Sequence, residues 1–335
     1  MSERVTITDV ARSAGVSVAT VSKVINGRYG VAAATSERVQ EVISRLGYES
    51  SLVARSLRSS RTNVIGILVA EFEPFSAEIL KGASAAVAST GYDLLAYSGT
   101  AHAGSDVGWE RRSLSRLSGT LIDGAVIVTP TVVEVRDDVP VVAIDPHEGP
   151  TGIATVDADN DAGAVLATEH LIALGHRRIA FLGGRTDLES SRLREEGFRS
   201  AMAAAGLPVD PRLVRVGGYR RETADRPAHE ILGLPDRPTA VFAANDLMAI
   251  ATIDAARDVG LRVPQDLSVV GFDDVPEAVA ATPPLTTVAQ PIQQMGAEAV
   301  GLLVRLIAGD DAARAHVRLP TRLVERGSTA PAPGR

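Results

Sequence analysis

From Asn63 onward, short apolar runs alternate with helical stretches, and this alternation limits the possible folds more than any other feature. Runs such as VIGILVA, GAVIVT, RIAFLGG and AVFAAND are short and largely apolar, which is typical of buried strands. Strands that alternate with helices form βαβ units and parallel sheets. About ten such strands in two groups predict two doubly wound subdomains with a cleft between them. Helices are expected over residues 76–89, 109–121, 162–174, 192–205, 223–232, 247–259 and 292–307.

The apolar runs are followed by clusters of Gly, Asn, Asp or Pro, as in VVAID, AAND and GFDD. In doubly wound sheets, ligands bind outside the carboxyl ends of the strands. These clusters therefore predict a ligand site in the cleft.

The region before Asn63 has a different pattern, that of short helices with clear start and stop signals. Thr6 and Asp9 have the spacing of a capping box, and Gly15 ends the helix that they begin. Ser17 can cap a second helix and Thr35 a third. We expect a small all-α head.

Two of these helices have the spacing of a helix-turn-helix. Ala11 is small enough for a close helix crossing, Gly15 suits the turn, and Val21 faces the core. Small side chains at the start of the second helix permit deep entry into a major groove, and its hydroxyls suit phosphates. A plain helical hairpin is the alternative. The residues exposed on the second helix would be Val18, Ala19, Ser22, Lys23 and Asn26.

Charge and composition agree with a DNA-binding head. Residues 1–61 hold nine Lys and Arg against five Asp and Glu, a net charge of +4, whereas the whole chain carries −7. A basic head on an acidic body suggests a polyanion partner for the head. The absence of Cys excludes disulfides and thiolate metal sites. No apolar run suits a membrane span or a secretion signal, so we expect a cytoplasmic protein.

Longer stretches identify a family. TITDVARSAGVSVATVSKVING and YESSLVARSLRSSRTNVIG closely resemble the lac repressor/galactose repressor family of bacterial transcription regulators, and so do HLIALGHRRIAFLGG, GLRVPQDLSVVGFDD and PPLTTVAQP. The resemblance implies a helix-turn-helix head over 1–49, a hinge helix and linker over 50–62, and a periplasmic-binding-protein-like body over 63–327. Its N-terminal subdomain would comprise 63–158 and 291–318, its C-terminal subdomain 159–290 and 319–327, with a flexible tail over 328–335.

The resemblance also implies roles in DNA binding. Val18, Ala19 and Lys23 match positions that choose bases, through contact with a thymine methyl group or donation to guanine. Leu57 matches the minor-groove wedge of the hinge helix. The full set expected to contact DNA is Thr6, Ser17, Val18, Ala19, Thr20, Ser22, Lys23, Asn26, Ala54, Leu57 and Arg58.

In the body, the resemblance implies an effector site between the subdomains. Its polar members suit vicinal hydroxyls and its aromatic members suit the C–H faces of a sugar ring. As local sequence, Asn245 and Asp273 are more typical of strand-end turns and helix caps, and Arg194 of a solvated helix. The expected set is Phe75, Asp145, Arg194, Tyr219, Asn245 and Asp273.

We therefore predict a homodimeric repressor of a pseudo-palindromic operator, with a sugar effector and no metal or cofactor. A nucleobase or another non-sugar effector is the alternative, and a sugar-binding protein or enzyme with the same body is a third hypothesis.

The chain lacks G-x-G-x-x-G, P-loop, H-E-x-x-H and G-x-S-x-G motifs. The Asp-rich VDADNDAG indicates a helix start. Members of the resembled family usually have a fuller helix where this chain has only residues 130–138, so the resemblance implies a reduced rim on the N-terminal subdomain. No leucine heptads follow the last strand, so we expect a dimer.

Overall fold

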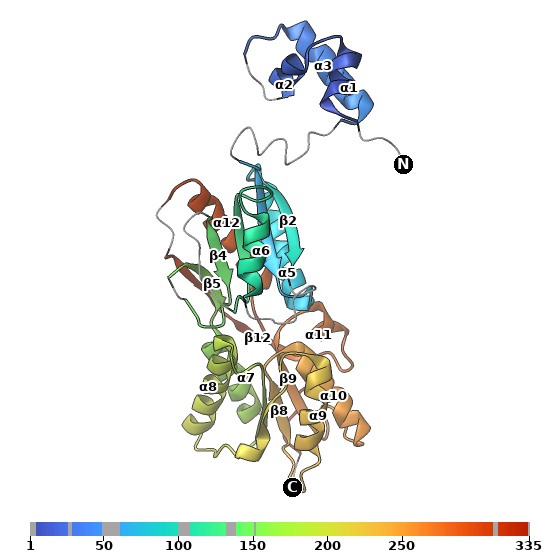
Figure 1. Cartoon of the computed structure of the whole chain (residues 1–335). Coiled ribbons are helices and arrows are strands. Elements are labelled where there is room, and N and C mark those ends of the chain that lie inside the picture. Colours follow the sequence, from blue (N-terminus) through green and yellow to red (C-terminus); the bar gives the residue numbers. More distant parts are fainter. Residues whose placement is uncertain are drawn as a thin grey trace. The chain divides into compact units, whose positions relative to one another are not determined.

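The computed structural model describes residues 5–25, 29–48, 61–99, 108–131, 139–150, 152–310 and 314–333. The chain divides after Thr62 into a helical head and an α/β body, which is the fold class predicted from the sequence (Figure 1). In these ranges no helix is both long and apolar enough to cross a membrane.

In the described part of the head, three short helices pack around a core of valines. Val10, Val21 and Val39 are fully buried there, and Ala11 is almost so. This confirms the core position predicted for Val21 and the close crossing predicted at Ala11. The helices are α1 (Ile7–Ala14), α2 (Val18–Ile25) and α3 (Ala33–Leu46).

The caps explain where these helices begin and end. The Thr6 backbone N–H and hydroxyl both donate to the Asp9 carboxylate, at 3.0 and 2.6 Å, as the capping-box prediction required. Gly15 ends α1 with a left-handed φ of 67°, which glycine adopts without strain. The cap predicted at Thr35 is wrong, because α3 begins at Ala33 after an extended Ala32 that makes no side-chain cap.

Two six-stranded sheets form the body. Their strand orders are β11-β5-β4-β3-β1-β2 and β12-β10-β9-β8-β6-β7, and all pairs are parallel except β10 with β12. The first sheet has β1 (Val64–Val69), β2 (Asp93–Ser98), β3 (Gly124–Val128), β4 (Val141–Ile144), β5 (Ala154–Ala158) and β11 (His316–Leu319). The second has β6 (Ile179–Gly183), β7 (Val214–Val216), β8 (Ala240–Ala243), β9 (Ser268–Asp273), β10 (Thr286–Ala289) and β12 (Arg322–Val324).

The first sheet and its helices form the N-terminal subdomain. A Cβ atom on Gly82 would lie 1.8 Å from the Gln293 carbonyl oxygen, and one on Gly296 would lie 2.3 Å from that of Ile79. The backbones of two helices therefore touch, and both glycines are required by space. The helices are α5 (Pro74–Val87), α6 (Trp109–Leu117) and α12 (Ile292–Ile307), and the glycines lie where α5 crosses α12.

The second sheet and its helices form the C-terminal subdomain. Figure 1 shows α7 and α8 on one side of this sheet and α9 and α10 on the other, the doubly wound arrangement. Phe181 lies in the middle of the core, and its ring centroid is 5.2 Å from that of Phe198 and 5.3 Å from that of Phe242. The helices are α7 (Asn160–Ala173), α8 (Glu189–Ala204), η1 (Pro211–Leu213), α9 (Arg221–Leu232), α10 (Asp246–Asp258) and α11 (Pro276–Ala280).

The chain passes between the two subdomains three times. The passages follow β5, β10 and β11, at residues 158–160, 289–292 and 319–322. They bring the carboxyl ends of strands from both sheets to a shared cleft, which is where the sequence predicted a ligand site.

Two expectations about the elements need correction. Helix α6 ends at Leu117 rather than at residue 121, because Ser118 adopts an extended backbone. The tail expected to be flexible is held from Ser328 to Ala332. Ser328 is fully buried and donates to the Val269 carbonyl, and the Ala332 N–H donates to that of Leu174. Low sequence complexity suggests a frayed end, whereas these residues form hydrogen bonds with backbone and side-chain groups of β9 and β10.

Candidate functional site

Helix α2 carries both polar and apolar side chains that are exposed on the surface of the head. Val18 is 41% exposed, and Ala19 and Lys23 are exposed. The Ser17 oxygen accepts the Thr20 N–H at 3.1 Å, so Ser17 caps the helix as predicted. The small side chains at the start of α2 leave its N-terminal turn accessible, so that this turn could enter a groove as wide and deep as the major groove of DNA.

The structure gathers most of the predicted DNA-contacting residues on this helix or at its start. Ser17, Val18, Ala19, Thr20, Ser22 and Lys23 lie there, while Thr6 caps α1. Four predicted positions lie outside the described residues: Asn26, Ala54, Leu57 and Arg58. The segment 130–138, predicted to form a reduced rim, also lies largely outside them.

Tyr29 is a residue that sequence reasoning did not single out. Its side chain is fully exposed, although aromatic rings are normally buried at least in part. Its position four residues after the end of α2 was the available signal.

The cleft of the body holds a pocket with an empty volume of about 1060 Å³, which includes space open to solvent. Residues from the strand ends and following turns of both subdomains line it. All six predicted effector positions are among them: Phe75, Asp145, Arg194, Tyr219, Asn245 and Asp273. The pocket thus brings together residues that the resemblance implied and that lie up to 198 positions apart in the sequence, Phe75 and Asp273.

Arg194 lies at the buried end of the pocket, only 4% exposed. Its Nε donates to the Asn160 side-chain oxygen at 2.9 Å, and its Nη1 donates to the Ala244 carbonyl and lies 3.4 Å from the Asp273 carboxylate. The guanidinium carbon lies 3.8 Å from the centre of the Phe272 ring, a cation–π contact. Arg194 is therefore a fixed part of the pocket rather than the solvated helix residue that was the alternative.

Two carboxylates accompany this arginine, that of Asp273, which is buried, and that of Asp145, which is half-buried. Burial raises the pKa of Asp145 to about 6 and that of Asp273 to about 7, and in both cases the charge of Arg194 opposes the increase. Gln290 donates to the Asp273 carboxylate at 2.7 Å. Carboxylates held in this way offer strong acceptors to a ligand that brings its own donors.

Asn245 has a structural role as well as a place in the pocket. Its side-chain oxygen accepts the Met248 N–H at 3.0 Å and so caps α10, and its amide donates to the Tyr219 carbonyl at 3.0 Å. The helix-cap interpretation is therefore right for its oxygen. One amide hydrogen is left over for a ligand.

Several pocket residues adopt a backbone conformation that side chains normally avoid. Thr129, Asp145, Tyr219 and Asp273 have φ values of 47°, 47°, 67° and 114°. Each such residue costs roughly 1–3 kcal/mol, and such residues cluster at functional sites. The Tyr219 ring lies against the Gly184 backbone, where a Cβ would come within 2.1 Å of the ring. The fold thus accepts strain to place these side chains.

Known proteins resemble this chain over nearly its whole length. The family described as bacterial regulatory proteins, lacI family, matches residues 6–51, and the periplasmic binding protein-like domain matches residues 168–329. The transcriptional repressor PurR of Aliivibrio fischeri is 35% identical, with 96% of this chain and 98% of that protein covered. The ribose operon repressor of Escherichia coli is also 35% identical, with 96% and 99% covered.

This chain belongs to the LacI family. Among solved structures, the lac repressor dimer bound to operator and an anti-inducer has a TM-score of 0.85 at 29% identity, covering 98% of this chain and all of that one. The regulator CelR in complex with cellobiose has a TM-score of 0.72 at 36% identity, covering 97% and 100%. The chain is thus a DNA-binding transcriptional repressor of the LacI family, and the enzyme hypothesis is set aside.

Other pocket residues of this LacI-family repressor escaped the sequence reasoning. His147 is buried, and its Nδ1 lies 3.2 Å from the Asp187 carboxylate of the other subdomain. Burial lowers the pKa of His147, so the ring is neutral at pH 7 and can offer its second nitrogen as an acceptor. Gln290 directly follows β10, and His147 lies three residues after the end of β4, so the strand-end rule points to both regions of the chain. The other missed lining residues that bear charge are Glu71, Glu73, Arg185 and Arg220.

Proposed function

We propose that this LacI-family repressor binds a pseudo-palindromic operator as a homodimer and that a sugar in the cleft pocket controls this binding. The pocket carries the proposal, because it combines buried acceptors, a fixed guanidinium and aromatic rings in a strained, strand-end arrangement. Hydrogen-bond acceptors and donors that point into the pocket from several sides can bind the vicinal hydroxyl groups of a sugar. Aromatic rings can pack against the C–H groups of the sugar ring. A relative named for the ribose operon and a solved regulator in complex with cellobiose also favour a sugar. A repressor acts where its operator lies, so we assign it to the cytoplasm.

On the DNA side, we propose that Val18, Ala19 and Lys23 read bases in the major groove. Their exposure on α2 supports this role, because side chains of a recognition helix must be free to reach base edges. Thr6, Ser17, Thr20, Ser22 and Asn26 would contact the backbone, and Ala54, Leu57 and Arg58 would act in the minor groove.

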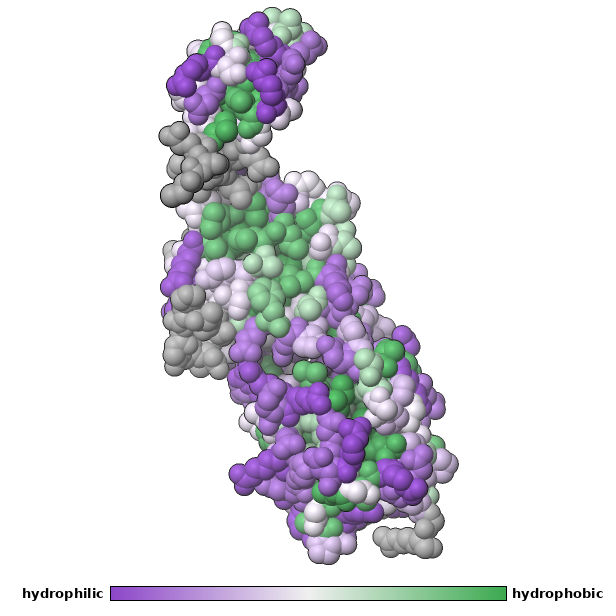
Figure 2. Space-filling view, turned by 90° about the vertical axis from the view of Figure 1, so that its right-hand side faces the viewer, coloured by the Kyte–Doolittle hydropathy of each residue, from purple (hydrophilic) through white to green (hydrophobic). Residues whose placement is uncertain are grey.

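We infer the homodimer from the surface of the body. Strand β2 lies at the edge of the first sheet, and its side chains Leu94, Leu95, Ala96 and Tyr97 are exposed or half-buried. Figure 2 shows hydrophobic side chains gathered on one face of the N-terminal subdomain. An apolar face beside a free strand edge needs a partner, and a second copy gives the symmetry that a pseudo-palindromic operator requires.

Operator selection from genomic DNA fragments tests the DNA-binding part. We expect enrichment of a pseudo-palindromic sequence, and we expect Lys23→Ala to weaken binding to it by about 1–3 kcal/mol through loss of a donor to a base. The chain has a second lysine, Lys81, which pairs with Glu78 on α5. Lys81→Ala is therefore the matched control and should leave affinity unchanged. Equal losses in both variants would contradict a base-reading role for Lys23.

The effector is identified by a thermal-shift screen of sugars and nucleobases, because a bound ligand raises the melting temperature. Trp109 is the only tryptophan of the chain and lines the pocket. Its fluorescence therefore gives an independent titration of each candidate. A nucleobase that binds where no sugar does would replace the sugar proposal with its alternative.

A further inference from the structure

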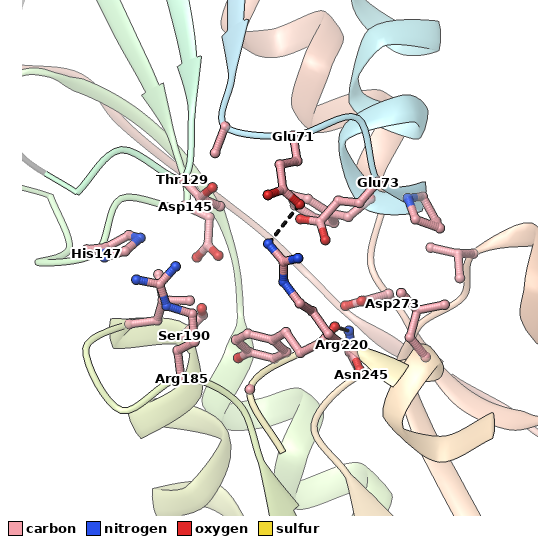
Figure 3. A pocket seen from close by; sticks show the side chains of 18 of the residues that line it. Glu71, Glu73, Thr129, Asp145, His147, Arg185, Ser190, Arg220, Asn245 and Asp273 are labelled. Carbon is pink, nitrogen blue, oxygen red and sulfur yellow. Dashed lines mark hydrogen bonds and ion pairs between the residues drawn. The ribbon is translucent and has the colours of Figure 1, made fainter. Parts of the chain in front are cut away.

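The mouth of the pocket is spanned by an ion pair that joins the two subdomains. Arg220, directly before α9, donates to the Glu71 carboxylate at 2.7 Å, although the two residues are 149 positions apart in the sequence. Figure 3 shows the Arg220 side chain crossing the pocket toward Glu71, with Glu73 on the same side. The side chains of Arg220 and Glu71 are 55% and 50% exposed, so the pair lies at the solvent side of the pocket.

Two carboxylates thus surround one guanidinium in this outer layer. The hydrogen bond that Arg220 donates to Glu71 is the largest cause of the raised pKa of Arg220, and the charges of Glu71 and Glu73 add to it. If Arg220 turned to an anionic ligand, both glutamates would lose their counter-charge beside that ligand. The outer layer is therefore poorly suited to a negative charge.

The buried end of the pocket, its inner layer, also has one guanidinium beside two carboxylates. Asp145 and Asp273 accompany Arg194, whose donors already serve the Asn160 side chain and the Ala244 carbonyl. The charges of Glu73 and Asp145 add to the increase in the pKa of Asp273. Above about pH 7, where Asp145 and Asp273 are ionised, the carboxylates of the two layers therefore repel one another, and an added anion would increase that repulsion.

The third guanidinium of the pocket, that of Arg185, is also paired with a carboxylate of the protein. Arg185 donates to both oxygens of Asp187, at 3.1 and 2.7 Å, a bidentate pair. The same carboxylate lies beside His147, whose ring is neutral at pH 7 because burial lowers its pKa. Every arginine that lines the pocket is therefore already paired with a carboxylate of the protein.

We propose that the pocket selects ligands that carry no negative charge and are rich in hydrogen-bond donors, so that it accepts an uncharged polyhydroxyl compound and rejects its phosphorylated or carboxylated forms. Hydroxyl groups donate to Asp145, Asp273, His147 and the Gln290 oxygen without displacing any cation from its partner. The Glu71–Arg220 pair then closes the mouth behind the ligand. This inference rests on the proposed sugar effector and specifies its charge.

Matched pairs of sugars test the inference on the full-length protein. The panel contains ribose and ribose 5-phosphate, glucose and glucose 6-phosphate, galactose and galacturonate, and cellobiose and cellobionate. Each is titrated by thermal shift and by Trp109 fluorescence. We expect at least one uncharged member to bind and its anionic counterpart to bind at least about tenfold more weakly, because like charges placed together in a binding site are strongly unfavourable. An anionic member that binds more tightly than its parent would overturn the inference and leave the sugar-responsive repressor intact. If no member binds, the proposed sugar effector is wrong and the inference falls with it.

Charge variants at the mouth give predictions of opposite sign for the ratio of neutral to anionic affinity. Glu71→Gln combined with Glu73→Gln removes the excess of carboxylates, and the ratio should fall about fivefold. Arg220→Gln removes the cation, and the ratio should rise. Glu196→Gln, at a residue 60% exposed on α8 and absent from the pocket lining, is the matched control and should leave the ratio unchanged. A ratio that moves the same way in both mouth variants would show that charge at the mouth does not select the ligand.

Discussion

At the scale of single residues, the pocket stores unfavourable electrostatic free energy. Asp273 is 6% exposed and has a left-handed φ of 114°, so both its charge and its backbone are costly. Local sequence could indicate that an Asp ending GFDD lies at a strand end, but not that Gln290 and Arg194 would meet it there. Those contacts depend on the register of β9 beside β10 and on the path of α8.

The raised pKa of Asp273 predicts a pH dependence of stability. With a pKa of about 7 in the fold against 3.8 ordinarily, the folded protein retains a proton that the unfolded chain has released. The free energy of unfolding should therefore fall as the pH rises from about 4 to about 7. Between pH 5 and pH 8, the free energy of unfolding of the wild type should therefore fall relative to that of Asp273→Asn, by up to about 3 kcal/mol.

Urea unfolding at pH 5, 6, 7 and 8 measures this difference. Asp210→Asn is the control, because hydrogen bonds from Arg212 lower the pKa of Asp210 and its titration is complete below this range. Parallel curves for wild type and Asp273→Asn would contradict the assignment.

At the scale of elements, helix centres were predicted well and helix starts less well. Helix α12 was predicted without error, whereas α7, α8 and α9 begin two or three residues earlier than expected. The start of α7 has a clear signal, since Asp159 accepts the Ala162 N–H. Leu188 and Arg220 precede α8 and α9 without a side-chain cap, so tertiary packing sets those two starts.

The crossing of α5 and α12 predicts opposite effects of two identical substitutions. Gly82→Ala would place a methyl group against the Gln293 backbone, and we expect a loss of about 1–3 kcal/mol in unfolding free energy. Gly301, on the exposed side of α12, has no atom within 4 Å of an added Cβ. Gly301→Ala should therefore stabilise by up to about 1 kcal/mol. Thermal and urea unfolding measure both variants, and a neutral Gly82→Ala would show that the helices can separate freely.

At the scale of the whole molecule, sequence patterns predicted two subdomains and a cleft but not the pairs that span it. Arg220 with Glu71, and His147 with Asp187, join segments that local patterns treat separately. Each of these residues looks like an ordinary surface charge or turn residue in the sequence. Only the three chain passages, which fix one subdomain against the other, give them partners.

The dimer proposal is tested at the free edge of the first sheet. Ala96→Arg introduces a charge on β2, and we expect it to convert the dimer to a monomer and to weaken operator binding, with effector binding retained. Val216→Arg, on the edge strand β7 of the second sheet, is the matched control. Light scattering after size exclusion reports the mass. A dimer that survives Ala96→Arg but not Val216→Arg would move the interface to the other subdomain.

The pairing of β11 with β5 has a consequence for synthesis on the ribosome. Strand β5 ends at Ala158, but its neighbour β11 is not complete until Leu319 has been made. The helix α12, which covers the same sheet, also comes after the entire C-terminal subdomain. The nascent N-terminal subdomain must therefore wait, with a sheet edge and an apolar face uncovered, while more than a hundred further residues are translated. A slow stretch of translation there would expose the chain to aggregation, whereas the contiguous head can fold as soon as it emerges.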